Sequence, residues 1–297
     1  METQKDFFML KPTRSIMGSI LIFFAASSLA QEAPLEWVST YTSTSPTIDG
    51  GMDEVWESAV ALTVVVRRAF GGTDPREVVL RALHTEDSLY VLAQWPDPTR
   101  SDLRDPYIWH AESERYERPT LADDQFALEF PLEGEFQVSM LPEGKSFSAD
   151  VWHWKAGRSN LDGWVDDKRH IISTEPVDGA LPYQLGGRAV IYIARPMDAG
   201  MASYKEVEPP ESFRGDILPS YEIQAQAPSD SQLDIRGKGV HDGIGWTLEM
   251  TRRFNTGNTD DAVIDPRQEI FCAIAVLDNE LYWQHSVSQK LVLRFHP

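Results

Sequence analysis

The 297-residue sequence contains a single cysteine, Cys272, and this scarcity excludes several kinds of site. One cysteine cannot form an intrachain disulfide or supply a thiolate zinc or iron–sulfur site. The C-x-x-C-H motif that attaches haem covalently is absent, so any haem must be bound non-covalently. Cys272 lies within an apolar run at residues 269–277, which indicates a small core residue rather than a nucleophile.

Basic residues are also few. The chain has 27 Lys and Arg against 46 Asp and Glu, which gives a formal net charge of −19. A surface of this sign repels nucleic acid and anionic membranes, so neither is expected as a partner. It suits a basic or redox partner steered by charge, although simple solubility explains most of these carboxylates.

No permanent membrane span is expected, because the apolar run at residues 16–26 is too short for one. This run follows a leader with Lys5, Lys11 and Arg14 and precedes small residues at positions 28–30. That order is typical of a secretory signal. We therefore expect residues 1–30 to be a cleaved signal peptide and the mature chain, from about Gln31, to be periplasmic. An uncleaved anchor is the alternative.

Familiar catalytic motifs are missing as well. The sequence has no Ser-His-Asp spacing, phosphate-binding loop or H-E-x-x-H motif. The acidic pairs Asp123-Asp124 and Asp260-Asp261 could suggest a calcium site or acid–base chemistry, but turn and cap chemistry explains them more simply. Catalysis by this chain alone is therefore not expected.

What the sequence does have is a series of short strand-like runs separated by turn residues. This pattern predicts an all-β fold, a β-sandwich with short helices and long loops. Residues 52–59 are expected to form one or two helical turns with Trp56 facing inward. No linker is obvious, so residues 31–297 are expected to form one domain. The expected strands are residues 61–69, 77–84, 88–95, 125–130, 188–194, 232–239, 245–254, 269–277 and 289–295.

The most informative chemistry lies at residues 136–158. Met140 ends one strand-like run, and a second run follows with Trp152, His153, Trp154 and Lys155. A thioether, aromatic rings and cationic side chains in one wall would suit a flat, anionic, metal-bearing ligand, which suggests haem. A methionine beside two tryptophans is also common in ordinary core packing.

Six segments stand out together: IDGGMDEVWESA, QWPDPTRSDLRDP, the acidic pair before QFALEFP, VWHWKAGR, DIRGKGVHDGIGWTLEMTRRFNTGNTDD and FCAIAVLDNELYWQHSVS. In this order they resemble the haem-binding family typified by the ethylbenzene dehydrogenase gamma subunit, also called the cytochrome c-552/DMSO reductase-like haem-binding domain. The resemblance covers nearly the whole mature chain. It implies an immunoglobulin-like or DOMON-like β-sandwich that holds one haem b between its sheets.

The resemblance also implies two axial ligands, a methionine before the WHWKA-like strand and a lysine just before the last strand. The methionine corresponds to Met140, whereas the lysine position holds His285, as in a related branch that has DN followed by a histidine. A neutral imidazole opposite a thioether fills both axial positions and suits electron transfer. His153 and Lys290 are the rival second ligands.

Cationic side chains near this stretch are expected to anchor the haem. Lys145, Lys155 or Arg158 could pair with the propionates, while Trp152 and Trp154 would pack against the ring or the core. The other histidines are interpreted as surface residues. They are His84, His110, His170, His241 and His296.

The sequence thus predicts a periplasmic b-type cytochrome, not an enzyme in itself, that exchanges electrons with molybdenum oxidoreductase subunits or a c-type cytochrome. One alternative is a haem-free carbohydrate- or ligand-binding sandwich that uses Trp109, Trp164 and Trp283 as stacking platforms. Another is a structural protein that has lost its cofactor. The methionine and histidine arrangement favours the cytochrome, because a sugar-binding module has no need of it.

Overall fold

The computed structural model describes residues 33–68, 75–138, 145–185, 189–279 and 285–296. Within these ranges the chain consists of β-strands and three short 3₁₀ helices, without an α-helix. The all-β prediction is confirmed. No helix in the described ranges is long and apolar enough to cross a membrane.

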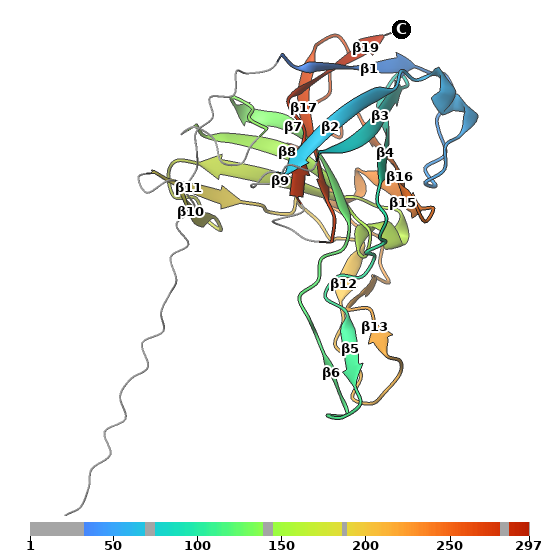
Figure 1. Cartoon of the computed structure of the whole chain (residues 1–297). Coiled ribbons are helices and arrows are strands. Elements are labelled where there is room, and N and C mark those ends of the chain that lie inside the picture. Colours follow the sequence, from blue (N-terminus) through green and yellow to red (C-terminus); the bar gives the residue numbers. More distant parts are fainter. Residues whose placement is uncertain (1–32, 69–74, 139–144, 186–188, 280–284, 297) are drawn as a thin grey trace, which may run out of the picture.

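Most strands belong to one 14-stranded sheet that folds over into two layers (Figure 1). Layer A contains β1 (Leu35–Tyr41), β2 (Leu62–Arg68), β3 (Arg76–His84), β4 (Ser88–Pro96), β15 (Arg236–His241), β16 (Gly245–Arg253) and β19 (Leu291–His296). Layer B contains β7 (Gln125–Gly134), β8 (Phe147–Lys155), β9 (Asp166–Ser173), β10 (Leu181–Leu185), β11 (Ala189–Ala194), β17 (Ile270–Leu277) and β18 (His285–Val287). The layers join where β18 pairs with β2 and where β17 pairs with both β7 and β19.

The nine strands expected outside residues 136–158 are present, as β2, β3, β4, β7, β11, β15, β16, β17 and β19, with ends that shift by a few residues. The second expected run within 136–158 is β8, whereas residues 136–138 of the first run form no strand. The largest shift at a strand start is in β15, because a 3₁₀ helix, η3 (Asp230–Leu233), occupies the first residues of the expected run. Alternation of apolar and polar residues was therefore a sufficient guide to these strands.

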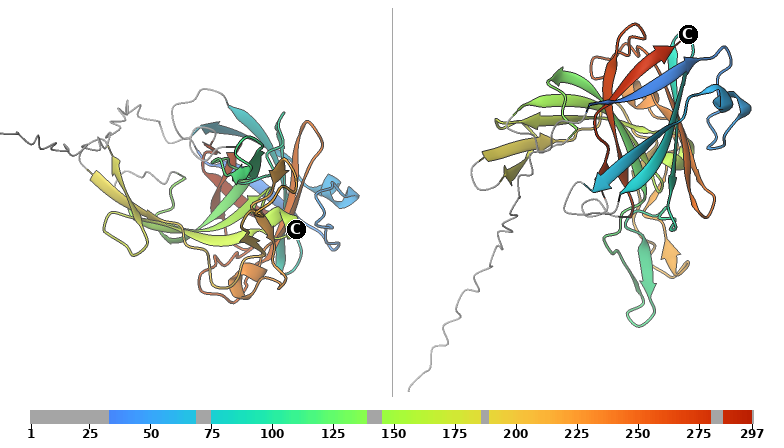
Figure 2. Two further views of the ribbon diagram at one scale, coloured as in Figure 1. Left: turned by 90° about the horizontal axis from the view of Figure 1, so that it is seen from below. Right: turned by 45° about the horizontal axis from the view of Figure 1, so that its top comes forward.

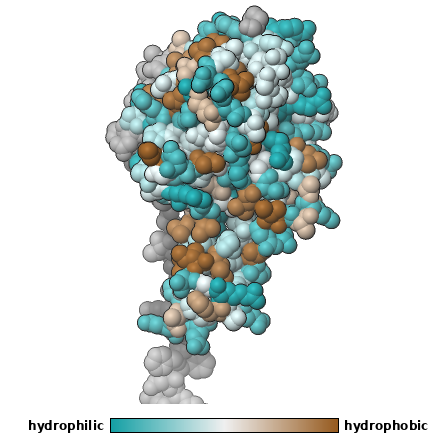
Figure 3. All heavy atoms as spheres, turned by 90° about the vertical axis from the view of Figure 1, so that its right-hand side faces the viewer, coloured by the Kyte–Doolittle hydropathy of each residue, from teal (hydrophilic) through white to brown (hydrophobic). Residues whose placement is uncertain are grey.

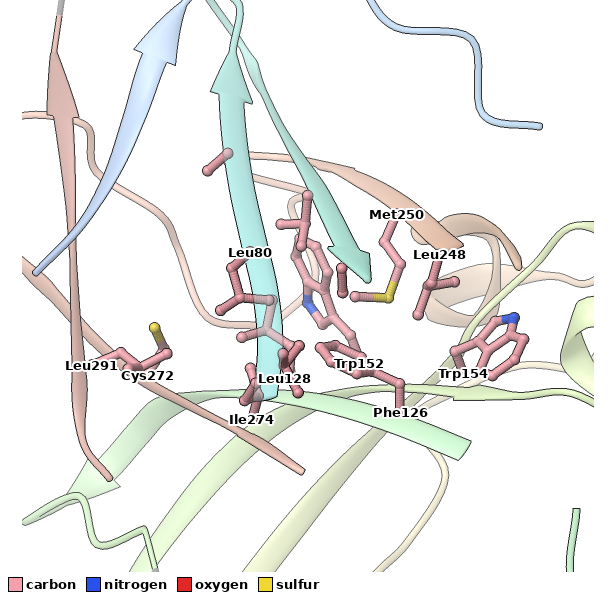
Figure 4. Packing of buried hydrophobic residues seen from close by; sticks show 14 of the residues in the cluster. Leu80, Phe126, Leu128, Trp152, Trp154, Leu248, Met250, Cys272, Ile274 and Leu291 are labelled. Atoms are coloured by element: carbon pink, nitrogen blue, oxygen red, sulfur yellow. The ribbon is translucent and has the colours of Figure 1, made fainter. Parts of the chain in front are cut away.

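The main core lies between the two layers (Figure 4). Side chains of Leu80, Leu248 and Met250 from layer A face Phe126 and Leu128 from layer B, and all five are fully buried. Each such side chain contributes about 1.5–3 kcal/mol by leaving water. Burial raises the pKa of the Cys272 thiol in the same core, which confirms that this cysteine is a packing residue.

The helical turn expected near Trp56 is a 3₁₀ helix, η1 (Glu54–Ser58). Trp56 is fully buried, and its indole N–H donates to Oε1 of Glu249 on β16 over 2.7 Å. The other oxygen of Glu249 accepts the backbone N–H groups of Asp49 at 3.0 Å and Gly50 at 2.8 Å. Gly50 has a φ of +84°, and a Cβ there would lie 2.6 Å from Val240. One buried carboxylate thus fixes the N-terminal turn onto layer A.

A slender extension projects from the sandwich (Figures 1 and 2). It contains a three-stranded sheet of β5 (Tyr107–His110), β6 (Arg115–Glu117) and β13 (Ile217–Leu218), and a pair formed by β12 (Tyr204–Glu206) and β14 (Tyr221–Ile223). Hydrophobic side chains lie on this part as well as on the sandwich (Figure 3). None of these strands was predicted, because strands of two to four residues are too short to show alternation.

Candidate cofactor site

Layer B is buried on both of its faces. Strand alternation turns Trp152 and Trp154 toward the main core, so His153 and Lys155 point to the opposite face, which we call the outer face. The outer face has an apolar cluster of its own. This cluster comprises Phe136, Phe147, Ala149, Val151, Ile172, Ile191, Ile193 and Ala273. The outer face is therefore a second interior surface, and it is where a flat ligand could be covered by apolar side chains.

His153 is the central polar residue of the outer face. Both of its ring nitrogens are buried, and neither has a hydrogen-bond partner among the described residues. Burial, followed by the charges of Lys155 and Lys168, holds the pKa of His153 well below its usual range. The imidazole is therefore neutral at pH 7, the form that binds a metal. An unsatisfied buried polar group costs about 1–3 kcal/mol, so this arrangement opposes folding.

Two buried lysines flank His153 on the same face. Lys155 forms an ion pair with Asp166, whose Oδ2 also accepts a hydrogen bond from the Tyr204 hydroxyl at 2.8 Å. Lys168 has no ion pair with any carboxylate that the structure describes. Burial and then the charge of Lys155 lower the pKa of Lys168 to about 7. A buried lysine without a carboxylate partner suits an anionic group such as a propionate.

A carboxylate and a second histidine extend this polar set. Oε2 of Glu129 on β7 lies 3.8 Å from Nδ1 of His170 on β9. Burial raises the pKa of Glu129 to about 8, so this side chain is mostly protonated at pH 7. Because the register pairs Glu129 with Val151, the residue two positions from His153 on β8, the pair lies beside the imidazole on the outer face.

The backbone of His285 lies in line with these residues. His285 pairs with Leu277 on β17, Leu277 pairs with Gln125 on β7, and Gln125 pairs with Lys155 on β8. The four residues form one row across four neighbouring strands. Met140, the other expected iron ligand, lies outside the described residues.

The family model of ethylbenzene dehydrogenase matches residues 53–288 of the chain. The chain belongs to the ethylbenzene dehydrogenase family. The resemblance of the six sequence segments is thereby confirmed. None of the curated proteins compared with the chain matches it.

The solved structures similar to this chain include carbohydrate-binding modules of low sequence identity. A family 9 carbohydrate-binding module from Caldicellulosiruptor kristjanssonii in complex with glucose is 11% identical, with 88% of this chain and 97% of that chain covered and a TM-score of 0.39. Its complex with cellotriose is also 11% identical, with 88% and 95% covered and a TM-score of 0.38.

Trp152 and Trp154 lie in the main core and are fully buried. The Trp154 indole donates to Oδ1 of Asn160 at 3.0 Å, and the guanidinium of Arg252 lies 4.9 Å from the centre of the Trp152 ring. Of the two roles expected for these tryptophans, packing against the core is the one that these contacts favour. Contact with a cofactor stays a prediction.

The three cations expected to hold propionates lie in different surroundings. Lys155 is buried and Arg158 is half-buried, and both are already paired, Lys155 with Asp166 and Arg158 with Asp123. Lys145 is exposed and pairs with the exposed Glu135. Lys168 was not among the predicted residues, because every residue from 166 to 170 is polar and the sequence of β9 therefore shows no alternation.

The structure also describes the rival iron ligand Lys290 and two of the three tryptophans expected as stacking platforms. The ammonium of Lys290 lies 5.2 Å from the centre of the Phe271 ring. Trp109 is half-buried against Phe213 in the extension, and Trp283 lies outside the described residues. One face of Trp164 is covered by the guanidinium of Arg236, 4.0 Å from the ring centre.

Two of the histidines interpreted as surface residues are not on the surface. His84 is only 7% exposed, with Nδ1 at 3.0 Å from the hydroxyl of Ser39. The side chain of His170 is 12% exposed, since it packs on the outer face. Both interpretations were wrong, because polar residue type alone cannot show that a strand is covered on both faces.

Proposed function

We propose that this chain is an electron-transfer protein that binds one non-covalent haem b on the outer face of layer B. The observation that carries the proposal is the neutral imidazole of His153. Its two ring nitrogens are buried and lack a partner among the described residues, and the ring lies near Lys155 and Lys168. Membership of the ethylbenzene dehydrogenase family supports the same assignment.

The residues of the outer face fit this cofactor in two respects. The apolar cluster around Val151 and Ile172 can exclude water from a macrocycle. Lys168 can bind a propionate without breaking an existing ion pair with a carboxylate that the structure describes. Lys155 lies near Lys168 and adds a second positive charge. When bound, haem supplies a one-electron iron couple whose potential depends on its axial ligands and on burial.

Met140 and His285 are the proposed axial ligands. Both belong to parts of the chain whose side chains the structure does not describe, but the backbone of His285 shares a row with Lys155. His153 is the rival, because its ring is already on the outer face. Two protein ligands would leave no open coordination position, which agrees with a subunit that has no catalytic site of its own.

The proposed partner is a redox protein, either the subunits of a molybdenum oxidoreductase or a c-type cytochrome. The net charge of −19 would steer a basic partner toward the chain and would make electron transfer sensitive to ionic strength. Residues 1–30 are proposed to direct the protein to the periplasm as a cleaved signal peptide.

The test is a visible spectrum of the periplasmically expressed protein, oxidised and then reduced with dithionite. We expect a sharp Soret band and, on reduction, the α and β bands of a six-coordinate b-type haem. Met140→Ala and His285→Ala should disturb these bands, while His110→Ala, at an exposed histidine, should not. If His153→Ala removes the bands and His285→Ala keeps them, His153 is the second ligand.

A protein that remains colourless after haemin is added would overturn the proposal. The haem-free alternative would then be tested by titration with glucose and cello-oligosaccharides. Sugar binding by the colourless protein would move the assignment to carbohydrate recognition.

A further inference from the structure

Four aspartates from separate segments converge on the core side of layer B, next to Arg252. Asp150 lies on β8, Asp167 on β9, Asp198 in the segment after β11 and Asp261 in the segment after β16. They are 0%, 0%, 4% and 6% exposed. One carboxylate oxygen from each of Asp150, Asp167 and Asp261 lies within 4.8 Å of the other two.

Most of the oxygens in this cluster lack a hydrogen bond. Among the residues that the structure describes, no donor reaches Oδ1 of Asp150, either oxygen of Asp167, either oxygen of Asp198, or Oδ1 of Asp261. Buried polar atoms are nearly always paired, so a single orphan would already need an explanation. Asp167 is the clearest case, because it is fully buried and has two unpaired oxygens.

The nearby arginines do not satisfy the cluster. Nη1 of Arg252 lies 2.7 Å from Oδ2 of Asp150, and its Nη2 donates to the carbonyl of Ala262. The same Nη1 is 3.8 Å from Asp167 and 3.6 Å from Asp261, beyond hydrogen-bonding distance. The guanidinium therefore donates to Asp150, and Asp167 receives no hydrogen bond from it.

The remaining aspartate is in a similar position. Nε of Arg169 approaches Oδ1 of Asp198 only to 3.4 Å, without a hydrogen bond, and the Arg169 side chain is 39% exposed. Thr256 donates to Oδ2 of Asp261, which leaves Oδ1 of that residue unpaired. Four carboxylates and two guanidiniums leave two negative charges in a dry interior, which is strongly unfavourable unless protons or a cation neutralise them.

Protons bind tightly here. Burial and then the charge of Asp150 raise the pKa of Asp167 well above its usual range. Burial, followed by the charges of Asp260 and Asp150, raises the pKa of Asp198 to about 7. A bound divalent cation would neutralise the carboxylates in place of these protons, and the protons would be released.

We infer that Asp150, Asp167, Asp198 and Asp261 form a divalent-cation site and that it takes calcium. Calcium binds six to eight oxygen ligands at about 2.3–2.6 Å, so two of its ligands lie at most about 5 Å apart. One carboxylate oxygen from each of Asp150, Asp167 and Asp261 meets this limit. Magnesium demands a stricter octahedron and keeps several waters, so a cage made of carboxylates suits it less well.

The site is separate from the proposed haem site. Asp167 pairs with Trp152 across β8 and β9 and so lies on the core face, whereas His153 lies on the outer face of the same sheet. Calcium would tie the segment after β11 to the segment after β16, because these supply Asp198 and Asp261. Its role is therefore structural, and it does not depend on haem.

The test uses the full mature protein, treated with EDTA and titrated with Ca²⁺ by calorimetry. We expect one Ca²⁺ per chain, release of protons, and a rise in the unfolding midpoint that Mg²⁺ at the same concentration reproduces only in part. Tb³⁺ should also bind and emit on excitation of tryptophan, since Trp152 packs against Arg252 at the site.

Two variants and a matched control make the result specific. Asp167→Asn and Asp198→Asn should lose the Ca²⁺-dependent rise, yet in EDTA each should be at least as stable as the wild type, because a like charge has been removed. Asp162→Asn, the same change at an exposed aspartate, should behave as the wild type. Haem spectra of all three should be unchanged, which separates this inference from the haem proposal.

Absence of calorimetric binding would overturn the inference, as would a midpoint shift that persists in both variants. A wild type that ignores Ca²⁺ and Tb³⁺ but gains stability as the pH falls toward 5 would show that shared protons alone neutralise the cluster.

Discussion

Arg158 and Asp123 form a two-point ion pair beneath the surface of the sandwich. Nη2 of Arg158 lies 2.7 Å from Oδ1 of Asp123, and Nε lies 3.1 Å from Oδ2. The backbone N–H of Gly157 donates to the same Oδ2 at 3.0 Å. The Asp123 carboxylate is fully buried, and it accepts from these three donors and from Nε2 of Gln125 at 3.2 Å. The pair holds the chain where it leaves β8, directly after Lys155.

Arg158→Ala should lower the free energy of unfolding by about 3–5 kcal/mol, because it leaves the buried carboxylate of Asp123 without its counter-charge. Urea denaturation of the haem-free protein measures the change. Lys145→Ala is the matched comparison, since its partner Glu135 is exposed, and it should leave the unfolding midpoint unchanged. An Arg158→Ala protein as stable as the wild type would show that solvent replaces the guanidinium.

Trp154→Phe should destabilise the protein by about 1–3 kcal/mol without changing its haem spectrum. The ring fills the main core, its N–H donates to Asn160, and a Cβ at Gly239 would lie 2.4 Å from Cζ2 of the ring. Thermal unfolding and the visible spectrum are recorded on the same samples. A shifted Soret band in this variant would instead support the sequence-based prediction that the tryptophan lines the cofactor.

Local patterns in the sequence were enough for the strands and for single buried residues. Alternation identified β7 through Phe126 and Leu128, and the apolar run around Cys272 identified β17 as a core strand. Trp56 faces inward as predicted. Each of these features depends on neighbours within one strand or turn, which a single sequence displays directly.

Features that depend on which distant segments come together could not be predicted from local sequence patterns. The aspartate cluster combines residues 150, 167, 198 and 261, which only the order of strands brings together. The ring nitrogens of His153 are buried because layer B is covered on both faces. A strand covered in this way shows no regular alternation of apolar and polar residues, so the sequence of β8 does not reveal which face His153 occupies. Asp260-Asp261 illustrates the limit, because Asp260 accepts the backbone N–H of Ala199 and the hydroxyl of Ser231, both far away in the sequence, rather than a donor of its own turn. Turn chemistry also leaves the unpaired oxygen of Asp261 unexplained.

Stability should fall as the pH rises through neutrality, in part because of Glu129. Its pKa is raised from 4.5 to about 8 by burial. Between these values the native state holds a proton that the unfolded state has lost, so this contribution is complete below about pH 4.5 and is lost by about pH 8. The slope is at most about 1.4 kcal/mol per pH unit.

Glu129→Gln should remove this slope, because the amide does not titrate. Urea denaturation of the haem-free protein from about pH 5 to about pH 8 gives the measurement. Glu133→Gln, an exposed position on the same strand, should keep the wild-type slope. Equal slopes in all three proteins would mean that the Glu129 carboxyl is hydrated in solution.

His153→Leu should stabilise the haem-free protein while weakening its affinity for haemin. The imidazole is buried without a partner in the described part of the chain, so an apolar side chain of similar size should recover up to about 1–3 kcal/mol. The control is His84→Leu, which replaces a buried histidine that bonds to Ser39 and packs edge-on against Phe295. That change should lower stability and leave haemin binding as it was.

Urea denaturation and haemin titration followed at the Soret band distinguish the outcomes for His153. Lower stability in His153→Leu would reveal a partner for the ring within the native fold. Higher stability with unchanged haemin affinity would place the cofactor away from the outer face. Higher stability with weaker binding would mean that the fold retains an unfavourable group because the ligand needs it, which is how a binding residue differs from a packing residue.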